Sequence, residues 1–81
     1  MKALFSIAAA EVFESLPDRV RGKALAILDL ILVFPEMYPL RQHGLMAGYR
    51  SFTVYAYLFY CSVSSNEIRV AAILPGRMEQ A

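Results

Sequence analysis

The chain has 81 residues, of which 58% are hydrophobic and 19% are charged, and its net charge is +1. This length suits one domain, residues 1–81. A domain so small buries only about two-thirds of the surface that its unfolded chain exposes, so its core is thin. The single cysteine excludes a disulfide framework, and we expect no metal, nucleotide or redox cofactor. Two explanations fit the surplus of apolar residues: a compact sheet rich in Tyr and Phe, or a permanent partner that covers an apolar groove.

The first predicted elements are a short strand over residues 2–7 (KALFSI) and a brief helix over residues 8–16 (AAAEVFESL). Pro17 ends this helix, because proline cannot continue one, and it opens a second helix as its first residue. Apolar residues of the second helix recur at helical spacing and form one stripe: Val20, Ala24, Ile27, Leu28 and Ile31.

The C-terminal half of the second helix is apolar nearly all round its axis. Its remaining apolar residues lie outside the stripe: Leu25, Leu30, Leu32 and Val33. A helix that is apolar on every side is typically buried on every side. We therefore expect this half to be covered on a second side, and we expect Pro35 to end the helix.

Residues 36–48 contain Pro and Gly without any period and read as a loop. From Tyr49 onward apolar and polar residues alternate, which predicts strands. Because residues 49–63 are too long for one typical strand, we expect a bend at Tyr55-Ala56. A turn at residues 64–66 (SSN) then leads to a last strand over residues 68–74.

This element order, β-α-α-β-β-β, predicts an α+β domain in which a helical hairpin lies on one face of a mainly antiparallel sheet. Cys61 alternates with Phe59 and Val63 and is expected to be a small buried residue. The opposite sheet face is expected to carry Leu58, Tyr60, Ser62 and some of Arg69, Ala71 and Ile73.

The chain is expected to be a soluble cytoplasmic protein. Glu11 and Glu14 interrupt the apolar start where a signal peptide would continue, and residues 51–66 are too short and too rich in Tyr and Ser to span a bilayer. Residues 1–36 hold four bases and five acids, giving −1, whereas residues 37–81 hold four arginines and two glutamates, giving +2. The second half thus offers at most a weak surface for nucleic acid, because phosphate affinity grows with the number of neutralising contacts.

Three segments in this order resemble the RelE/ParE superfamily of toxins from type II toxin–antitoxin systems. ESLPDRV resembles the family's helical-hairpin junction, GYRSFTVYAYLFYCSV its strand pair, and IRVAAILPGR its final strand with a basic exit. The resemblance implies a growth-arresting toxin that a cognate antitoxin holds silent by wrapping its surface. It also implies one of two targets: DNA gyrase for ParE-like members, or mRNA on the ribosome for RelE-like members.

Judged by the resemblance, this chain carries only some of the residues that RelE-like ribonucleases use to cleave RNA. Cleavage of RNA through its own 2′-hydroxyl needs a proton acceptor, cations that stabilise the charged phosphorus, and a proton donor. Arg77 matches an arginine beyond the last strand of RelE-like ribonucleases, and Arg50 lies in the strand that supplies their basic residues. Leu58 stands where another arginine is expected, and Tyr49 and Ser51 replace lysines. The downstream tyrosine or histidine of the family would fall past residue 81.

The catalytic residues therefore stay unassigned, with Arg77, Arg50 and His43 as candidates. His43 titrates near neutral pH and suits a proton shuttle, or it is an ordinary exposed loop residue. The candidates for partner or phosphate contacts are Arg50, Arg69, Arg77 and Tyr60. Each of these residues also has a structural explanation, because tyrosines in strands commonly pack in the sheet and arginines in strands commonly face solvent. Three functions remain open: a gyrase-binding toxin, an mRNA endonuclease with a reduced site, and a decayed member that only binds protein.

Overall fold

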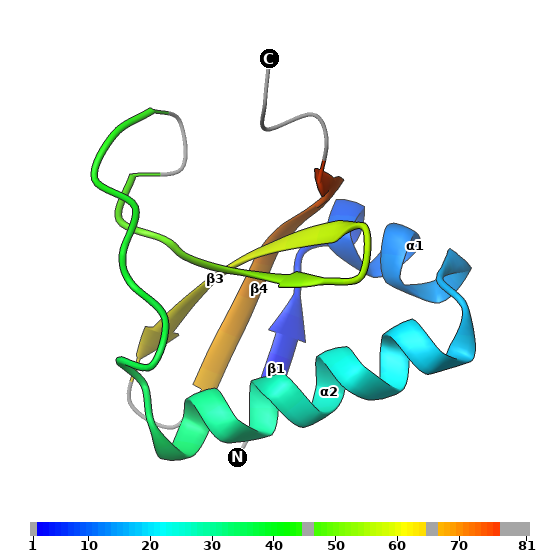
Figure 1. Cartoon of the computed structure of the whole chain (residues 1–81), viewed down its shortest axis with the longest axis horizontal. Coiled ribbons are helices and arrows are strands. Elements are labelled where there is room, and N and C mark those ends of the chain that lie inside the picture. The colour runs from blue at the N-terminus through cyan, green and yellow to red at the C-terminus, as the bar shows by residue number, and fades with distance from the viewer. Residues whose placement is uncertain (1, 45–46, 65–66, 77–81) are drawn as a thin grey trace.

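The computed structural model describes residues 2–44, 47–64 and 67–76. Its elements follow the predicted order: β1 (Lys2–Phe5), α1 (Ile7–Ser15), α2 (Asp18–Val33), β2 (Arg50–Val54), β3 (Tyr57–Ser64) and β4 (Glu67–Pro75). The strands form one sheet in the order β1-β4-β3-β2, in which β1 runs parallel to β4 and the other pairs are antiparallel (Figure 1). The predicted α+β fold is confirmed. No helix of the described residues is long and apolar enough to cross a membrane.

The helical hairpin turns at Leu16 and Pro17. Ser6 caps α1, because its Oγ accepts a hydrogen bond of 3.0 Å from the Ala9 N–H. Pro17 is the N-cap of α2 rather than its first helical residue, so the prediction was one residue off. The position suits proline because its carbonyl accepts from the Val20 and Arg21 N–H groups, at 3.0 and 3.1 Å, while its missing N–H is not needed.

The core lies between the helices and one face of the sheet. As predicted, the α2 stripe is turned inward, with Val20, Ala24, Leu28 and Ile31 each at most 3% exposed. Its partners in the sheet include Phe52 and Phe59, whose rings stack with centroids 5.0 Å apart. Burial of these side chains supplies the main driving force for folding.

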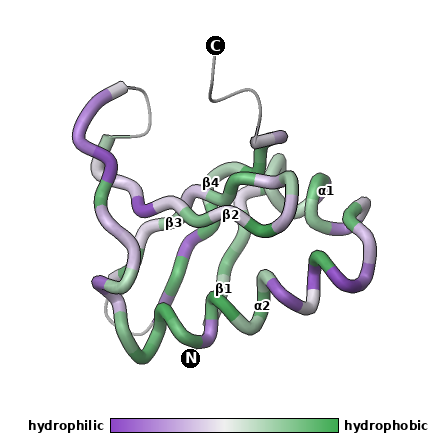
Figure 2. Tube along the Cα trace, in the orientation of Figure 1, coloured by the Kyte–Doolittle hydropathy of each residue, from purple (hydrophilic) through white to green (hydrophobic). Residues whose placement is uncertain are grey.

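The expected burial of α2 on a second side is wrong for the described chain. Leu25, Leu30 and Val33 are 45%, 47% and 61% exposed, because both the sheet and α1 lie on the other side of the helix. Figure 2 shows hydrophobic residues gathered in the C-terminal half of α2 and hydrophilic ones near its start. Part of the apolar surplus in the composition is therefore displayed at the surface.

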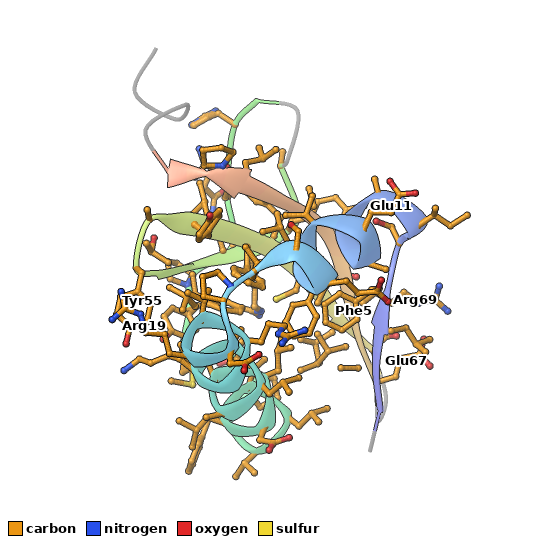
Figure 3. All side chains as sticks on the ribbon, turned by 90° about the vertical axis from the view of Figure 1, so that its right-hand side faces the viewer. Phe5, Glu11, Arg19, Tyr55, Glu67 and Arg69 are labelled. Carbon is orange, nitrogen blue, oxygen red and sulfur yellow. The ribbon has the colours of Figure 1, made fainter. Side chains whose placement is uncertain are left out.

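The turn between β2 and β3 falls at Tyr55-Ala56, as predicted. Tyr55 has φ 54°, a left-handed conformation that a bulky residue rarely adopts. The Arg19 guanidinium lies 5.0 Å from the centroid of the Tyr55 ring and links the turn to α2 (Figure 3). Gly76 passes close to the same turn: its N–H donates to the Ala56 carbonyl at 2.6 Å, and a Cβ there would lie 3.2 Å from that oxygen.

A register shift divides β4 into two halves. Tyr60 pairs with Ala72, but Cys61 pairs with Val70, so Ala71 is an extra residue in β4. An inserted residue reverses which side chains face the core, because strands alternate with a period of two. Of the β4 residues considered for the opposite face, Arg69 therefore lies there beside Ser62, whereas Ile73 is buried in the core. Of the predicted turn at 64–66, Ser64 ends β3 and residues 65–66 lie outside the described residues.

Candidate functional site

The sheet face turned away from the helices carries most of the chemistry that the described residues offer. Leu4 pairs with Arg69, Arg69 with Ser62, and Ser51 with Tyr60, so these side chains form adjoining rows across the strands. We call this surface the open face, and it comprises Leu4, Tyr49, Ser51, Leu58, Tyr60, Ser62 and Arg69. The predicted grouping of Leu58, Tyr60 and Ser62 on one face is confirmed by this register.

A cavity of about 230 Å³ lies at one end of the open face, across β1, β4 and β3. Its lining includes the polar residues Ser6, Tyr49, Ser62 and Arg69, and its apolar residues include Leu4. Ser6 is held there because its Oγ donates to the Ala71 carbonyl at 2.9 Å. The cavity thus combines one cation with hydroxyl groups, an arrangement that suits an anionic or hydrogen-bonding group of a partner.

Arg69 projects from β4 into solvent, with its side chain 64% exposed. Its Nε donates to the Glu67 Oε2 at 2.8 Å (Figure 3). An exposed ion pair of this kind contributes little to stability. Glu67 orients the guanidinium and offsets part of its charge. Because the ion pair is weak, Arg69 can exchange it for a contact with a partner with little loss of folding stability.

Tyr60 is packed rather than displayed, with only 1% of its surface exposed. The Arg41 guanidinium carbon lies 5.5 Å from the centroid of the Tyr60 ring, in a cation–π geometry. Arg41 comes from the loop after α2, and it brings a second positive charge over the open face. The packing explanation of Tyr60 is favoured, and the half-buried Arg41 covers its ring.

The loop that carries Arg41 winds round the edge of β2. Tyr38 packs on the helix side, with its ring 5.6 Å from that of Phe52. Leu40 bridges to Arg50 at the sheet edge, and the Arg41 N–H donates to the Tyr49 carbonyl at 2.8 Å. The loop therefore covers one end of a strand edge that would otherwise be open to pairing.

Arg50 lies on the helix side of the sheet, not on the open face. It pairs directly with Cys61, which is in the core, and directly opposed residues share a face. Its NH1 donates to the Tyr38 carbonyl at 2.6 Å and fastens the loop. Arg50 and Arg69 thus stand on opposite faces of the sheet and cannot contact one group together.

The other two catalytic candidates are less defined. His43 is exposed in the loop after α2, and Arg77 lies outside the described residues. Within residues 2–44, 47–64 and 67–76, no three His, Cys, Asp or Glu side chains are grouped to hold a metal ion. The predicted contact set therefore divides: Arg69 and Tyr60 share the open face, and Arg50 has a structural contact on the other side.

Burial raises the pKa of Cys61 to about 11 from 9.0, and the nearby Arg50 charge lowers it by a smaller amount. Between pH 9.0 and about 11 the thiol is ionised in the unfolded chain but still protonated in the folded chain. Stability is thus fully present below pH 9.0 and falls as pH rises towards about 11, by about 2–3 kcal/mol. Urea unfolding at pH 8 and pH 11 should show this loss in the wild type and a smaller one in Cys61→Ala. An equal loss in both would contradict the assignment.

Sequence reasoning missed Arg41, Tyr49 and Ser62 as members of the site. The alternation of β3 placed Ser62 beside Tyr60, but nothing in the sequence showed a cavity there. Arg41 stands in an aperiodic loop, so its position over Tyr60 depends on the path round β2. The Pro and Gly residues of this loop indicate a turn, but not the direction in which it leads.

Two solved structures share this fold over nearly the whole chain. The RelB–RelE antitoxin–toxin complex from Methanococcus jannaschii matches with a TM-score of 0.66 and 14% identity, covering 95% of this chain and 94% of that chain. The YoeB/ParE toxin from Agrobacterium tumefaciens matches with a TM-score of 0.69 and 20% identity, covering 93% and 98%. No protein-family model matches the sequence, and no curated protein matches it. The chain therefore has the fold of RelE- and YoeB/ParE-type toxins, as its sequence predicted.

Proposed function

We propose that this chain is the toxin of a type II toxin–antitoxin system, which arrests growth in the cytoplasm until a cognate antitoxin silences it. The observation that carries the proposal is the fold, which matches two toxin structures over more than 90% of each chain. One fold hosts several functions, so the mode of action rests on the residues of the open face.

The proposed mode of action is ParE-like: the toxin binds DNA gyrase and does not cut a substrate itself. RNA cleavage needs an acid, a base and charge stabilisation around one phosphate. Arg50 is fastened to Tyr38 on the helix side, and the resemblance matches Leu58, on the open face, to an arginine of the RelE-like ribonucleases. These contacts support binding over catalysis.

The second candidate is a RelE-like mRNA endonuclease with a reduced site. The observation that favours it is the pair of arginines on the open face, Arg41 over Tyr60 and Arg69 beside the cavity. Arginine's planar fork suits phosphate oxygens. In this case the guanidinium groups would stabilise the charge that develops on the phosphate.

Induced expression in bacteria separates these functions in one culture. We expect growth to stop, a DNA-damage reporter to rise, and primer extension on abundant mRNAs to show no cuts at codon positions. Cuts at codon positions without damage signalling would replace the gyrase proposal by the endonuclease. Unimpaired growth at verified expression would overturn the toxin proposal and leave a protein-binding role.

A further inference from the structure

The loop after α2 passes from the helix side of the sheet to the open face within a few residues. We call residues 36–48 the edge loop, which Figure 1 shows in green between the end of α2 and the start of β2. Tyr38 packs on the helix side, with its ring 5.6 Å from that of Phe52. Three residues later, the Arg41 guanidinium lies over Tyr60 on the open face. The place of Arg41 therefore depends on how the edge loop is attached to the edge of β2.

Two backbone hydrogen bonds fix Arg41 itself. Its N–H donates to the Tyr49 carbonyl at 2.8 Å, and its carbonyl accepts from the Gly48 N–H at 2.9 Å. Gly48 has φ 89°, a left-handed conformation that glycine adopts without steric cost. Because the backbone is fixed on both sides, the Arg41 side chain can leave it in only a few directions.

Arg50 supplies the side-chain bond that fastens the start of the edge loop. Its NH1 donates to the Tyr38 carbonyl at 2.6 Å, and Leu40 forms a backbone bridge to Arg50 at the sheet edge. Hydrogen bonds from a charged donor are stronger than those between neutral groups. Arg50 is also half-buried, and a hydrogen bond shielded from water is electrostatically stronger. Arg50 is thus well suited to hold a loop that has no regular secondary structure of its own.

Arg50 and Arg41 lie on opposite sides of the sheet edge. Arg50 stands opposite Cys61 of the core, and its guanidinium is bonded on the helix side. Arg41 lies on the open face, over Tyr60. Any effect of Arg50 on the open face must therefore pass through the edge loop.

We propose that Arg50 is a positioning residue: by fastening the edge loop to β2, it keeps Arg41 over Tyr60 for contact with the target. This inference rests on the proposed function, in which the open face meets the target. Without the Arg50 side chain, the Tyr38 carbonyl loses its donor and backbone bonds alone hold the loop. Segments held by few bonds open locally while the rest of the fold stays intact. Arg41 then spends part of its time away from the open face.

Amide hydrogen exchange of the purified chain, followed by NMR, tests whether Arg50 fastens the loop. In Arg50→Ala, the Arg41 and Gly48 amides should exchange about tenfold faster or more, because a hydrogen bond from a charged group is lost. The Ser6 amide is the internal control, since it donates to the Val70 carbonyl at the opposite edge of the sheet and should keep its rate. Unchanged rates at Arg41 and Gly48, or an equal increase at Ser6, would overturn the proposal.

Growth arrest tests whether Arg50 acts through Arg41. Arg50→Ala should need about tenfold higher expression than the wild type, and adding it to Arg41→Ala should change the requirement by less than about twofold. Adding it to Arg69→Ala should multiply the two losses, because Arg69 is oriented separately by Glu67. A further tenfold loss, or about that, in Arg41→Ala/Arg50→Ala would overturn the proposal, because Arg50 would then act by itself.

Two further variants give the same test without Arg50→Ala. Arg50→Lys keeps the charge and one donor for the Tyr38 carbonyl, so it should restore most of the protection and of the growth arrest. Gly48→Ala leaves Arg50 in place but strains the left-handed backbone, so it should release Arg41 and weaken arrest. Wild-type protection and arrest in Gly48→Ala would contradict the proposal.

Arg19→Ala is the matched control, because Arg19 also ties a turn to another element through its guanidinium. It should change neither the exchange of the Arg41 amide nor growth arrest. If the wild type does not arrest growth at verified expression, the proposed function fails. The exchange rates then still decide whether Arg50 holds the edge loop.

Discussion

Phe59→Ala is expected to destabilise the fold by about 3–5 kcal/mol. Phe59 is fully buried at the centre of the sheet, where it stacks on Phe52 and pairs with Ile73 across β4. Truncation removes the transfer free energy of the ring and leaves a cavity that rigid neighbours on both strands cannot fill. A domain of this length has a total stability of roughly 4–12 kcal/mol, so the loss is a large share of it.

Urea unfolding followed by far-UV circular dichroism measures this change. The control is Thr53→Ala in the neighbouring strand, because Thr53 is exposed and its loss should change stability by at most about 0.5 kcal/mol. A loss below about 1 kcal/mol in Phe59→Ala would contradict the packing described here.

The double variant Arg41→Ala/Arg69→Ala should need roughly a hundredfold higher expression than the wild type to arrest growth. The two guanidinium groups are the described cations of the open face, one over Tyr60 and one at the cavity. A contact between arginine and a partner group contributes about 1–3 kcal/mol, and each 1.4 kcal/mol is tenfold in affinity. Removal of Arg69 should cost the fold little, since the Arg69–Glu67 ion pair is exposed.

Arg19→Ala is the matched control for that variant. Arg19 also stacks on a tyrosine, with its guanidinium 5.0 Å from the Tyr55 ring, but it lies on the opposite side of the molecule from Arg69 (Figure 3). It should arrest growth like the wild type at equal expression. If the double variant and the wild type arrest growth equally, the open face is not the surface that meets the target.

The sequence predicted the fold well because its strongest signals are periodic. The stripe from Val20 to Ile31 is turned inward as expected, and strand length alone indicates that residues 49–63 must bend, which they do at Tyr55-Ala56. The sequence left open which of Arg69, Ala71 and Ile73 share the opposite face, because the extra residue in β4 reverses the alternation and Ala71 carries no turn or glycine signal to mark it. The Pro17 boundary was off by one residue, which is the usual precision of a helix end.

The candidate site was harder to predict, because it depends on which face each arginine occupies. Arg50 was a candidate contact residue alongside Arg69, yet its pairing with Cys61 turns it towards the core. Arg41 stands in a loop without period, and only the path of that loop brings it over Tyr60. Sequence spacing fixes faces within one strand, but it does not fix the register between strands or the course of a long loop.

The apolar residues of this chain lie partly in the core and partly at the surface. Tyr60 shows that part of the aromatic content is packed into the sheet, as a compact Tyr- and Phe-rich fold would require. Leu30, Val33 and Phe34 show that another part is displayed on α2. Of the two explanations offered by composition, a packed sheet therefore accounts for the first part, and the second part lies at the surface of α2.

The most direct test of the central claim is supercoiling of relaxed plasmid by purified DNA gyrase in the presence of this chain. The proposal predicts inhibition that rises with toxin concentration, is reversed by the antitoxin, and is lost in Arg41→Ala/Arg69→Ala. Normal supercoiling at a large molar excess of folded chain, together with codon-positioned cuts in mRNA when ribosomes are supplied, would contradict it.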